Sequence, residues 1–546
     1  MNAFLEHLVA LPIVVPLVTG AFLLLLSEEQ RLARTSLAFL SVILQFAAAV
    51  VLLYLTSDAA PFIWGNGIGV YTLGGWPAPF GIVLVADRLS AVMLTLEAVL
   101  SLAVLSYVVA RWDRPGQPFH TLLQFLMMGL NGAFLTGDLF NLFVFVEILL
   151  AASYGLMLRY AGANRVGIGL HYLVVNISAS VLFLVGVAMI YGVTGTLNMA
   201  DLARRFTALA PDARTLFDTG AAILGVAFLV KAGSWPLNLW LPGTYSVAVA
   251  PVGAAFSLMT KVGVYALLRV GTLMSEDEAA ASMLGMMMFY FGIATLLAGT
   301  VGMLAAHHLA RLVSHSVIAS TGILLAALGL GIEALTTPVL FYLIVSSLTT
   351  GIFFMLAGMT ERTRSMPSLA MPAAAPEPTS PFFLAFGVRA PDPHSTGDDV
   401  GIAIPRAIAF LGLVFVSCVL LVTGLPPLPG FIAKFALLST AIDSAQAVGL
   451  GAAAWTLAAA VLLNGFIGVV ALTRLGIRLF WSVSARTTPR LLVVEAAPVA
   501  LLVVLCILLG TASSPVISYL DDAAMSLHEP QDYIRTVLTG ADGAEP

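Results

Sequence analysis

Charged side chains are scarce in this sequence: Asp, Glu, Lys and Arg make up 10% of its 546 residues, whereas hydrophobic residues make up 60%. The mean hydropathy is +1.01. Soluble globular domains are about 25% charged, so this composition excludes a soluble fold. We therefore expect a polytopic membrane protein.

The hydrophobic residues fall into about fourteen stretches, each long enough to cross a bilayer as a helix of about 20 residues. This pattern predicts an all-α fold with about fourteen transmembrane helices. The stretches lie near residues 3–26, 36–56, 84–109, 118–137, 139–160, 169–193, 219–249, 251–272, 283–305, 309–331, 336–359, 405–444, 451–480 and 491–511.

Cysteine and the usual enzyme motifs are also scarce or missing. Cys418 and Cys506 lie in apolar stretches without metal-ligand spacing, which argues against a disulfide or a zinc site. The sequence has no phosphate loop ending in GK[ST], no HExxH, no CxxC, no Rossmann fingerprint and no soluble segment long enough to hold a nucleotide. We expect no cofactor, no metal and no catalytic residue, and a transporter driven by an ion gradient or by partner subunits.

Lysine is rarer still: the chain has three, Lys231, Lys261 and Lys434, and each lies inside an apolar stretch. A lysine at the centre of a membrane helix costs about 2.5–3.5 kcal/mol on insertion scales, so such groups usually have a function there. Lysine suits proton exchange because its proton affinity changes readily on burial, whereas arginine stays charged.

The arginines are distributed unevenly. If the N-terminus lies outside, fifteen arginines fall on the inner side of the predicted bundle and six on the outer side. Cytoplasmic loops carry the excess of cations in membrane proteins. The pattern therefore predicts that both termini face outward.

Two stretches, 219–249 and 405–444, are long and contain helix-breaking residues. Proline lacks a backbone donor, so each interruption leaves backbone groups unpaired at membrane depth, which is tolerated where they are buried in protein or line a wet cavity. Paired broken helices are the best sequence pointer to an ion site. The prolines at the two interruptions are Pro236, Pro242, Pro426, Pro427 and Pro429.

Lys231 precedes its interruption and Lys434 follows its own, the order that an inverted repeat would give. Glu147 and His315 lie at similar distances before these lysines once a Pro/Ala/Ser-rich insert is left out. Asn464 would then correspond to Lys261. We predict helices 1–3 in residues 1–116, a first five-helix repeat in 117–272, a second in 283–480 with an inside loop at about 362–400, and a last helix with an acidic tail in 491–546.

Three further features have plain interpretations. Asp87 is predicted to pair with its neighbour Arg88 at the end of a helix, although a role in ion entry is an alternative. Residues 196–216 resemble a helix lying along the membrane surface. The acidic residues from 521 to 546 are expected to form a solvated terminus.

Five residues could carry protons through the membrane: Glu147, Lys231, Lys261, His315 and Lys434. A carboxylate paired with a buried lysine would hold or release a proton as the pair closes or opens. Histidine titrates near neutrality and could relay protons. The alternatives are a static ion pair for the glutamate, snorkelling to the interface for a lysine, and a simple hydrogen bond for the histidine.

Several longer motifs resemble those of one family over nearly the whole chain. They are similar to the D subunit of Mrp-type, or Pha-type, multisubunit cation/proton antiporters, within a superfamily that includes the antiporter-like membrane subunits of respiratory complex I. The motifs are NLFVFVEILLAASYGL, YGVTGTLNMADLA, KAGSWPLNLWLPGTY, APVGAAFSLMTKVGVYALLR and GLPPLPGFIAKFALL.

The resemblance implies a fourteen-helix subunit with inverted five-helix repeats in the bacterial cytoplasmic membrane. It implies other membrane subunits as partners and exchange of Na⁺ or another monovalent cation for protons. It also implies that Glu147, Lys231, Lys261 and Lys434 form the central proton path, with His315 between them.

Two alternatives stay open at this point. One is a proton-pumping subunit of a respiratory complex I or a membrane-bound hydrogenase. Such subunits typically read WLPDAH where this chain reads Leu241-Pro242-Gly243-Thr244-Tyr245, which favours the antiporter branch. The other is an assembly subunit whose buried charges only hold helices together.

Overall fold

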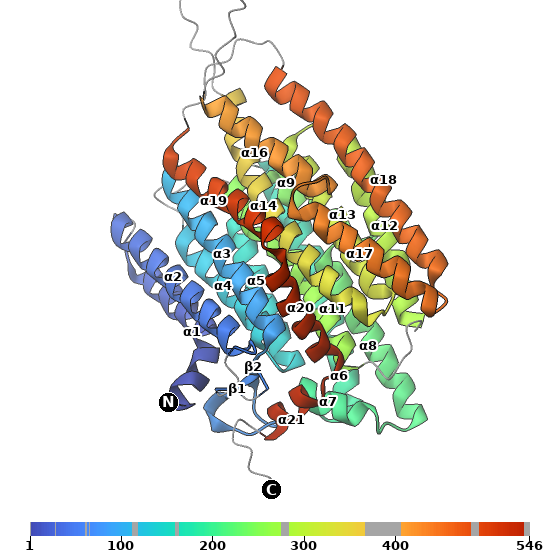
Figure 1. Cartoon of the computed structure of the whole chain (residues 1–546). Coiled ribbons are helices and arrows are strands. Elements are labelled where there is room, and N and C mark those ends of the chain that lie inside the picture. Colours follow the sequence, from blue (N-terminus) through green and yellow to red (C-terminus); the bar gives the residue numbers. More distant parts are fainter. Residues whose placement is uncertain are drawn as a thin grey trace, which may run out of the picture.

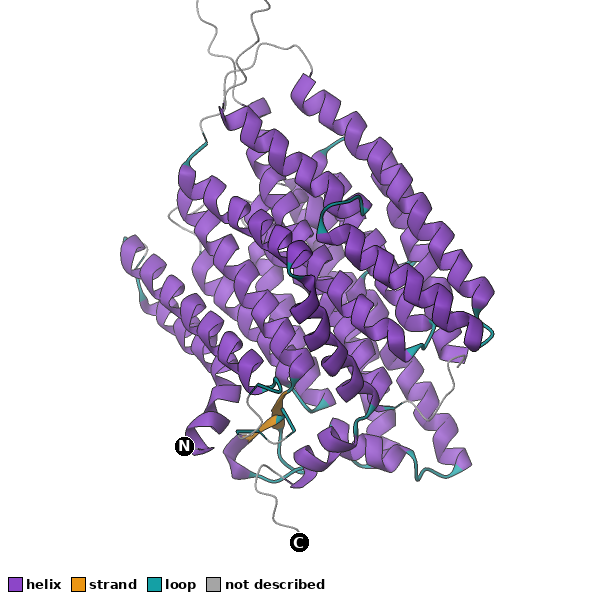
Figure 2. Cartoon of the chain, in the orientation of Figure 1, coloured by secondary structure: helices purple, strands orange, loops and turns teal. Residues whose placement is uncertain are grey.

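The computed structural model describes residues 2–27, 29–59, 63–64, 66–111, 118–158, 163–274, 283–365, 406–481 and 491–539. These residues are nearly all helical (Figure 2). Within them, thirteen helical segments are long and apolar enough to cross a membrane, and α4 (Phe119–Leu135) is apolar but has only 17 residues. The all-α membrane class is confirmed, whereas the count of fourteen spans stays a prediction because it depends on α4.

The helices pack side by side in one bundle (Figure 1). The first part of the chain contains α1 (Asn2–Leu25), α2 (Arg31–Leu55), β1 (Gly69–Thr72), β2 (Val83–Ala86) and α3 (Arg88–Arg111). The predicted first repeat contains α4, α5 (Leu139–Met157), α6 (Ala163–Thr194), α7 (Met199–Phe206), α8 (Pro211–Ala232), α9 (Trp240–Val247), α10 (Ala250–Ala255) and α11 (Met259–Leu273).

The predicted second repeat contains α12 (Met283–Ala305), α13 (Leu309–Gly329), α14 (Thr336–Ser365), α16 (Arg406–Thr423), α17 (Pro429–Ala447) and α18 (Gly451–Gly476). The described part of the chain ends with α19 (Val493–Thr511), α20 (Ser513–His528) and α21 (Gln531–Thr539). Most of the predicted loop at 362–400 lies outside the described residues. The inverted relation of the two repeats stays a prediction.

Strands β1 and β2 form a small antiparallel hairpin between α2 and α3, with Gly69 opposite Ala86. Leu84 of β2 also pairs with Thr136 at the end of α4. The hairpin therefore ties the first three helices to the first repeat at the end of the bundle where α1 begins (Figure 1).

Both predicted interruptions are present. The first separates α8 from α9 and begins at Gly233, whose φ of 74° is in the left-handed region that favours glycine. It includes Pro236 and a 3₁₀ turn at Leu237–Leu239. Pro242, which we expected inside the interruption, lies in the first turn of α9 instead, where proline is tolerated because the N–H groups of a first turn have no helical partner.

The second interruption separates α16 from α17. It begins at Gly424, with φ 77°, and contains Pro426 and Pro427, whereas Pro429 is the first residue of α17. A third interruption was not predicted: a 3₁₀ turn at Phe256–Leu258 divides the predicted helix 251–272 into α10 and α11. No proline lies in that turn, so it has no local signal in the sequence.

The predicted solvated terminus is wrong for its first part. Residues 521–539 lie in α20 and α21, and Leu520, Ala523 and Leu527 of α20 are buried. The helices are anchored by hydrogen bonds from Tyr519 to Thr56 (2.7 Å) and between His528 and Thr336 (2.8 Å). The apolar residues follow helical spacing, so packing against α3 and α14 outweighs the acidic residues on the other face.

The predicted pairing of Asp87 with Arg88 is also wrong. Asp87 lies just before the span that begins at Arg88, and it binds Arg269 of α11 through two contacts of 2.6 and 2.7 Å. Arg88 instead pairs with Asp58. Burial raises the pKa of Asp87, but the Arg269 guanidinium, aided by Ser90, holds it below its ordinary value. The pair therefore stabilises the fold at neutral pH, and that stabilisation is lost only as the pH falls through the lowered pKa.

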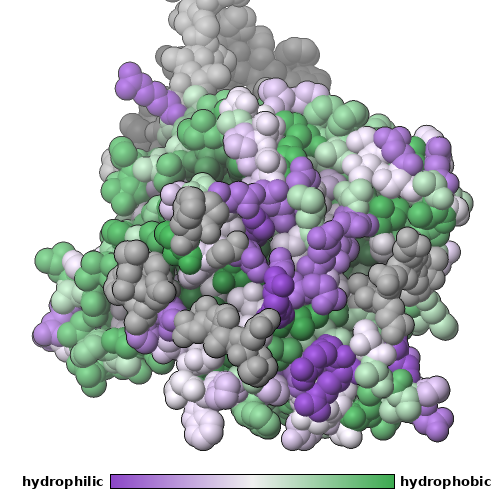
Figure 3. All heavy atoms as spheres, turned by 60° about the horizontal axis from the view of Figure 1, so that its bottom comes forward, coloured by the Kyte–Doolittle hydropathy of each residue, from purple (hydrophilic) through white to green (hydrophobic). Residues whose placement is uncertain are grey.

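The surface agrees with a membrane setting. Many large hydrophobic side chains are exposed along the helices, among them Leu170, Leu462 and Phe466. Seen from the end where α1 begins, hydrophilic residues gather toward the middle and lower part of the face and hydrophobic residues lie around the rim (Figure 3). Helix α7 lies at this end (Figure 1), with Asp201 fully buried against Arg204 and Arg205, whereas residues 211–216 of the predicted surface helix form the start of α8 instead.

Candidate functional site

Glu147 and Lys231 are joined through a serine. Ser180 of α6 donates a hydrogen bond to the carboxylate of Glu147 on α5. The Lys231 Nζ at the end of α8 donates to the Ser180 hydroxyl (3.3 Å) and to the Asn176 carbonyl (3.4 Å). Both charged side chains are half-buried. Among the described residues no direct ion pair joins the glutamate and the lysine, so the serine hydroxyl connects the two charges.

A small cavity opens beside Lys231. Its polar lining comes from Lys231, Tyr172 and Asn176, and its apolar lining includes Met259 and Val262 of α11. Those two residues flank Lys261 in the sequence. The cavity therefore extends from the first lysine toward the helix that carries the second.

Helices α8 and α11 approach closely next to these lysines. A Cβ at Gly263 would lie 2.6 Å from the Ala232 nitrogen and 2.6 Å from the Phe228 carbonyl oxygen, so only glycine fits there. Ala232 follows Lys231, and Gly263 lies two residues after Lys261. The close contact thus brings the segments that bear Lys231 and Lys261 together.

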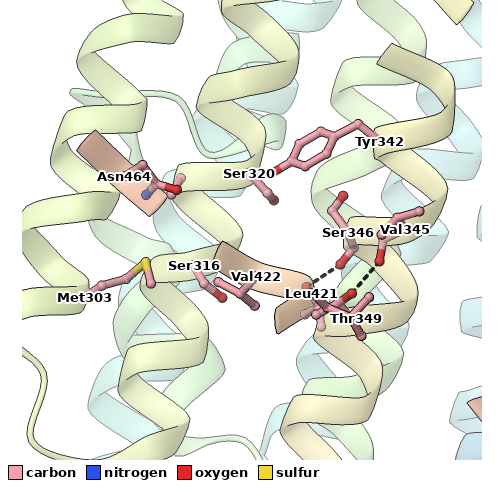
Figure 4. A pocket seen from close by; sticks show the side chains of 12 residues that line it. Met303, Ser316, Ser320, Tyr342, Val345, Ser346, Thr349, Leu421, Val422 and Asn464 are labelled. Carbon is pink, nitrogen blue, oxygen red and sulfur yellow. Dashed lines mark hydrogen bonds between the residues drawn. The ribbon is translucent and has the colours of Figure 1, made fainter. Parts of the chain in front are cut away.

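Lys261 is 1% exposed, and its Nζ donates a hydrogen bond of 2.9 Å to the Ser320 hydroxyl of α13. Ser320 in turn lines a second cavity, shown in Figure 4. Hydroxyl groups from α13 and α14 surround this cavity, and Tyr342 extends from α14 toward Ser320. The polar lining residues are Ser316, Ser320, Tyr342, Ser346, Thr349, Thr350 and Asn464.

Lys434 is linked to the second cavity through a backbone carbonyl. Its Nζ donates a hydrogen bond of 2.7 Å to the carbonyl of Val422, which also lines the cavity. In a continuous helix that carbonyl would accept from the N–H of residue 426, but Pro426 has none. The ammonium group therefore occupies the C-terminal end of α16, where the helix dipole favours a cation.

His315 does not join this arrangement. Its ring packs against Gly302 of α12, where a Cβ would lie 2.1 Å from Nδ1. Its neighbour Ser316, not His315, lines the second cavity. Asn464, the predicted counterpart of Lys261, lines the cavity and donates a hydrogen bond of 2.8 Å to Thr300 of α12.

Two hydroxyl groups of this row and one buried carboxylate outside it were not identified from the sequence. Ser180 and Ser320 connect to the lysines, but a neutral hydroxyl in an apolar helix gives no signal of its own. Glu97 of α3 did offer one, as a carboxylate within an apolar stretch. It is 1% exposed and accepts a hydrogen bond of 2.6 Å from Ser101 on its own helix.

The site contains proton carriers and polar connections, and the described ranges hold no group of three or more His, Cys, Asp and Glu side chains placed to bind a metal. From α5 to α17 the order is Glu147, Ser180, Lys231, the first cavity, Lys261, Ser320, the second cavity and Lys434. Carboxylate, ammonium and hydroxyl groups in such a row can pass protons between them.

Comparisons with known proteins bear on the family to which this chain belongs. The sequence model of the family described as NADH:quinone oxidoreductase/Mrp antiporter, transmembrane, matches residues 136–375. The D subunit of a probable K(+)/H(+) antiporter of Rhizobium meliloti is 45% identical, over 99% of each chain. The D subunit of an Na(+)/H(+) antiporter of Alkalihalophilus pseudofirmus is 32% identical over 98% of this chain and all of the relative.

A chain in the solved structure of the Mrp complex from Dietzia sp. DQ12-45-1b has a similar fold. It superposes with a TM-score of 0.79 at 25% identity, covering 98% of this chain and 99% of the other. The fold, the motifs and the sequence identity over the full length therefore indicate the same family. This chain belongs to the family of the D subunits of multisubunit Mrp-type cation/proton antiporters.

Proposed function

We propose that this chain is the proton-translocating D subunit of a multisubunit antiporter that exchanges a monovalent cation for protons across a bacterial cytoplasmic membrane. The observation that carries the proposal is the row of lysines, hydroxyls and two cavities that runs from Glu147 to Lys434. Each lysine has a polar partner: Ser180 for Lys231, Ser320 for Lys261 and the Val422 carbonyl for Lys434.

In this mechanism a proton entering the row binds a lysine other than Lys231, and the added positive charge nearby weakens the link between the Lys231 ammonium group and Glu147. Because Ser180 can donate to the carboxylate while accepting from the ammonium, it transmits the charge state of one group to the other. The displaced charge then favours cation movement nearby. His315 packs against Gly302 of α12 next to Ser316 of the second cavity, and we assign it no step in this row.

The exchanged cation is Na⁺ or K⁺, the ions named for the two relatives compared above. Other membrane subunits complete the complex, as in the Dietzia assembly. We place both termini outside the cytoplasm, which the arginine distribution supports; α1 begins and α21 lies at the same end of the bundle (Figure 1).

The test is exchange by the intact complex in everted membrane vesicles, measured as collapse of an imposed pH gradient on addition of NaCl or KCl. Lys231→Ala should abolish exchange while the complex still assembles, and Lys434→Ala should impair it. Arg535→Ala, which removes an exposed cation from α21, is the matched control and should leave exchange unchanged. Exchange at the wild-type rate in the Lys231 variant would refute the mechanism.

The same preparation distinguishes the antiporter function from the alternative of a respiratory proton pump. The antiporter function requires exchange without electron transfer, and the purified complex should contain small membrane subunits. Flavin or iron–sulfur subunits that co-purify in fixed proportion, with no cation-dependent exchange, would contradict it.

A further inference from the structure

Thr295 of α12 makes every hydrogen bond that its hydroxyl allows. The hydroxyl donates to the Phe291 carbonyl on its own helix (2.6 Å) and accepts from the backbone N–H of Trp235 (2.8 Å). The Ser234 hydroxyl lies 3.1 Å away and must be a donor, because the only proton of Thr295 is already used. The side chain is 0% exposed.

The groups bound by Thr295 belong to the interruption after Lys231. In a continuous helix the Trp235 N–H would bond to the carbonyl of residue 231, but α8 ends at Ala232. Thr295 takes the donor that the interruption releases. The backbone N–H four residues after Lys231 and the hydroxyl three residues after it are therefore held by a residue from the other predicted repeat.

The same helix also contacts the second cavity. One and a half turns further along α12, the Thr300 hydroxyl donates to the Leu296 carbonyl (2.7 Å) and accepts from Asn464 (2.8 Å), which lines that cavity. Helix α12 packs tightly on α13, since a Cβ at Gly299 would lie 2.4 Å from the Ala319 nitrogen. A rigid helix thus joins the first interruption to the second cavity.

We propose that Thr295 is a positioning residue for Lys231: it fixes the interruption after α8, and through α12 it couples that interruption to Asn464 at the second cavity. The role of Lys231 in proton exchange rests on the function proposed above. The hold of Thr295 on the backbone does not, so the two can fail separately.

The test replaces the hydroxyl and keeps the shape. Thr295→Val is close to isosteric but removes the acceptor of the Trp235 N–H and one partner of the Ser234 hydroxyl, which should lower the maximal exchange rate about tenfold and shift its pH profile. Thr295→Ser keeps the hydroxyl and should restore both. Thr244→Val is the matched control, since Thr244 is a buried threonine whose hydroxyl bonds only to the Trp240 carbonyl of its own helix.

A second measurement tests the conformation of the interruption without measuring exchange activity. Leu237→Cys places a thiol at a half-exposed position of the interruption, while Cys418 and Cys506 are fully buried. In the assembled complex, adding Thr295→Val should change the alkylation rate of this thiol several-fold, and adding Thr295→Ser or Thr244→Val should not.

The outcomes are separable. An unchanged alkylation rate with Thr295→Val shows that Thr295 does not hold the interruption and overturns the proposal. A changed alkylation rate with an unchanged pH profile overturns the positioning of Lys231. If the wild-type complex shows no exchange, the proposed function fails and with it the positioning role, whereas the alkylation result still decides whether Thr295 fixes the backbone.

Discussion

The two interrupted helices use the same backbone device and give their lysines different partners. In each, a glycine with positive φ ends a helix and a proline follows two or three residues later. Lys231 precedes its interruption and reaches a carboxylate through Ser180. Lys434 follows its interruption and binds a single backbone carbonyl at the end of α16.

This difference separates a responsive group from a fixed one. Lys231 is linked through Ser180 to a carboxylate, a group that can change charge. The carbonyl that holds Lys434 belongs to a helix end and cannot change charge. Under the proposed function, the first interruption is therefore suited to switching and the second to passing a proton onward.

The largest effect is expected from removing the carboxylate of the first interruption. Glu147→Gln removes the acid that Lys231 reaches through Ser180, and because a positioned acid or base contributes about 100-fold or more to a proton transfer, exchange should fall at least about 100-fold. The measurement is exchange rate per assembled complex in vesicles. A rate within twofold of wild type would remove the distinction between the two lysines.

The next largest effect concerns the connecting serine. Ser180→Ala breaks the link between Lys231 and Glu147, and since a hydrogen bond to a charged group is worth about 1.5–3 kcal/mol, exchange should fall about tenfold. Ser178→Ala is the control, because Ser178 is exposed two residues away and bonds only to the Val174 carbonyl of its own helix. Equal rates for the two variants would mean that the glutamate and the lysine act independently.

The second interruption can be tested through its glycine. A Cβ at Gly424 would lie 2.7 Å from Lys434 Cδ, so Gly424→Ala should push the lysine from the Val422 carbonyl and lower exchange about fivefold, as expected for overpacking. Gly449→Ala is the control: its φ of 73° imposes the same backbone strain, but a Cβ there meets nothing within 4 Å. Parallel losses in both variants would show that strain alone matters.

The smallest effect should come from the C-terminal helices. The Arg269 guanidinium lies 5.4 Å from the ring centre of Tyr533. Tyr533→Leu should therefore cost about 0.5–2 kcal/mol of stability, the range for cation–π contacts. We expect a melting temperature a few degrees lower and an unchanged exchange rate, because neither interruption is altered. A loss of exchange comparable to that of Ser180→Ala would place α21 in the transport machinery.

Much of the fold followed from local signals in the sequence. Apolar length located the spans, and Pro236, Pro426 and Pro427 marked the interruptions, because a proline removes a backbone N–H wherever it lies. The turn at Phe256–Leu258 has no such residue and was missed.

The charged residues of the candidate site could be predicted from the sequence, but the hydrogen bonds that connect them could not. A lysine in an apolar helix has a large energetic cost and is conspicuous. The hydroxyls of Ser180, Ser320 and Thr295 cost little energy in an apolar helix. Their roles depend on hydrogen-bond partners that are far away in the chain. The helical spacing of Leu520, Ala523 and Leu527 indicates a packed face on α20, but the acidic residues of this segment suggested a solvated terminus.

The contact between Arg269 and Tyr533 has a consequence for biogenesis. The chain is synthesised from its N-terminus, so Asp87 and Arg269 can meet as soon as α11 has been inserted, long before α21 exists. The ring of Tyr533 takes its place beside Arg269 only after α21 has been made. The helix that carries Lys261 thus reaches its final surroundings when translation is almost complete.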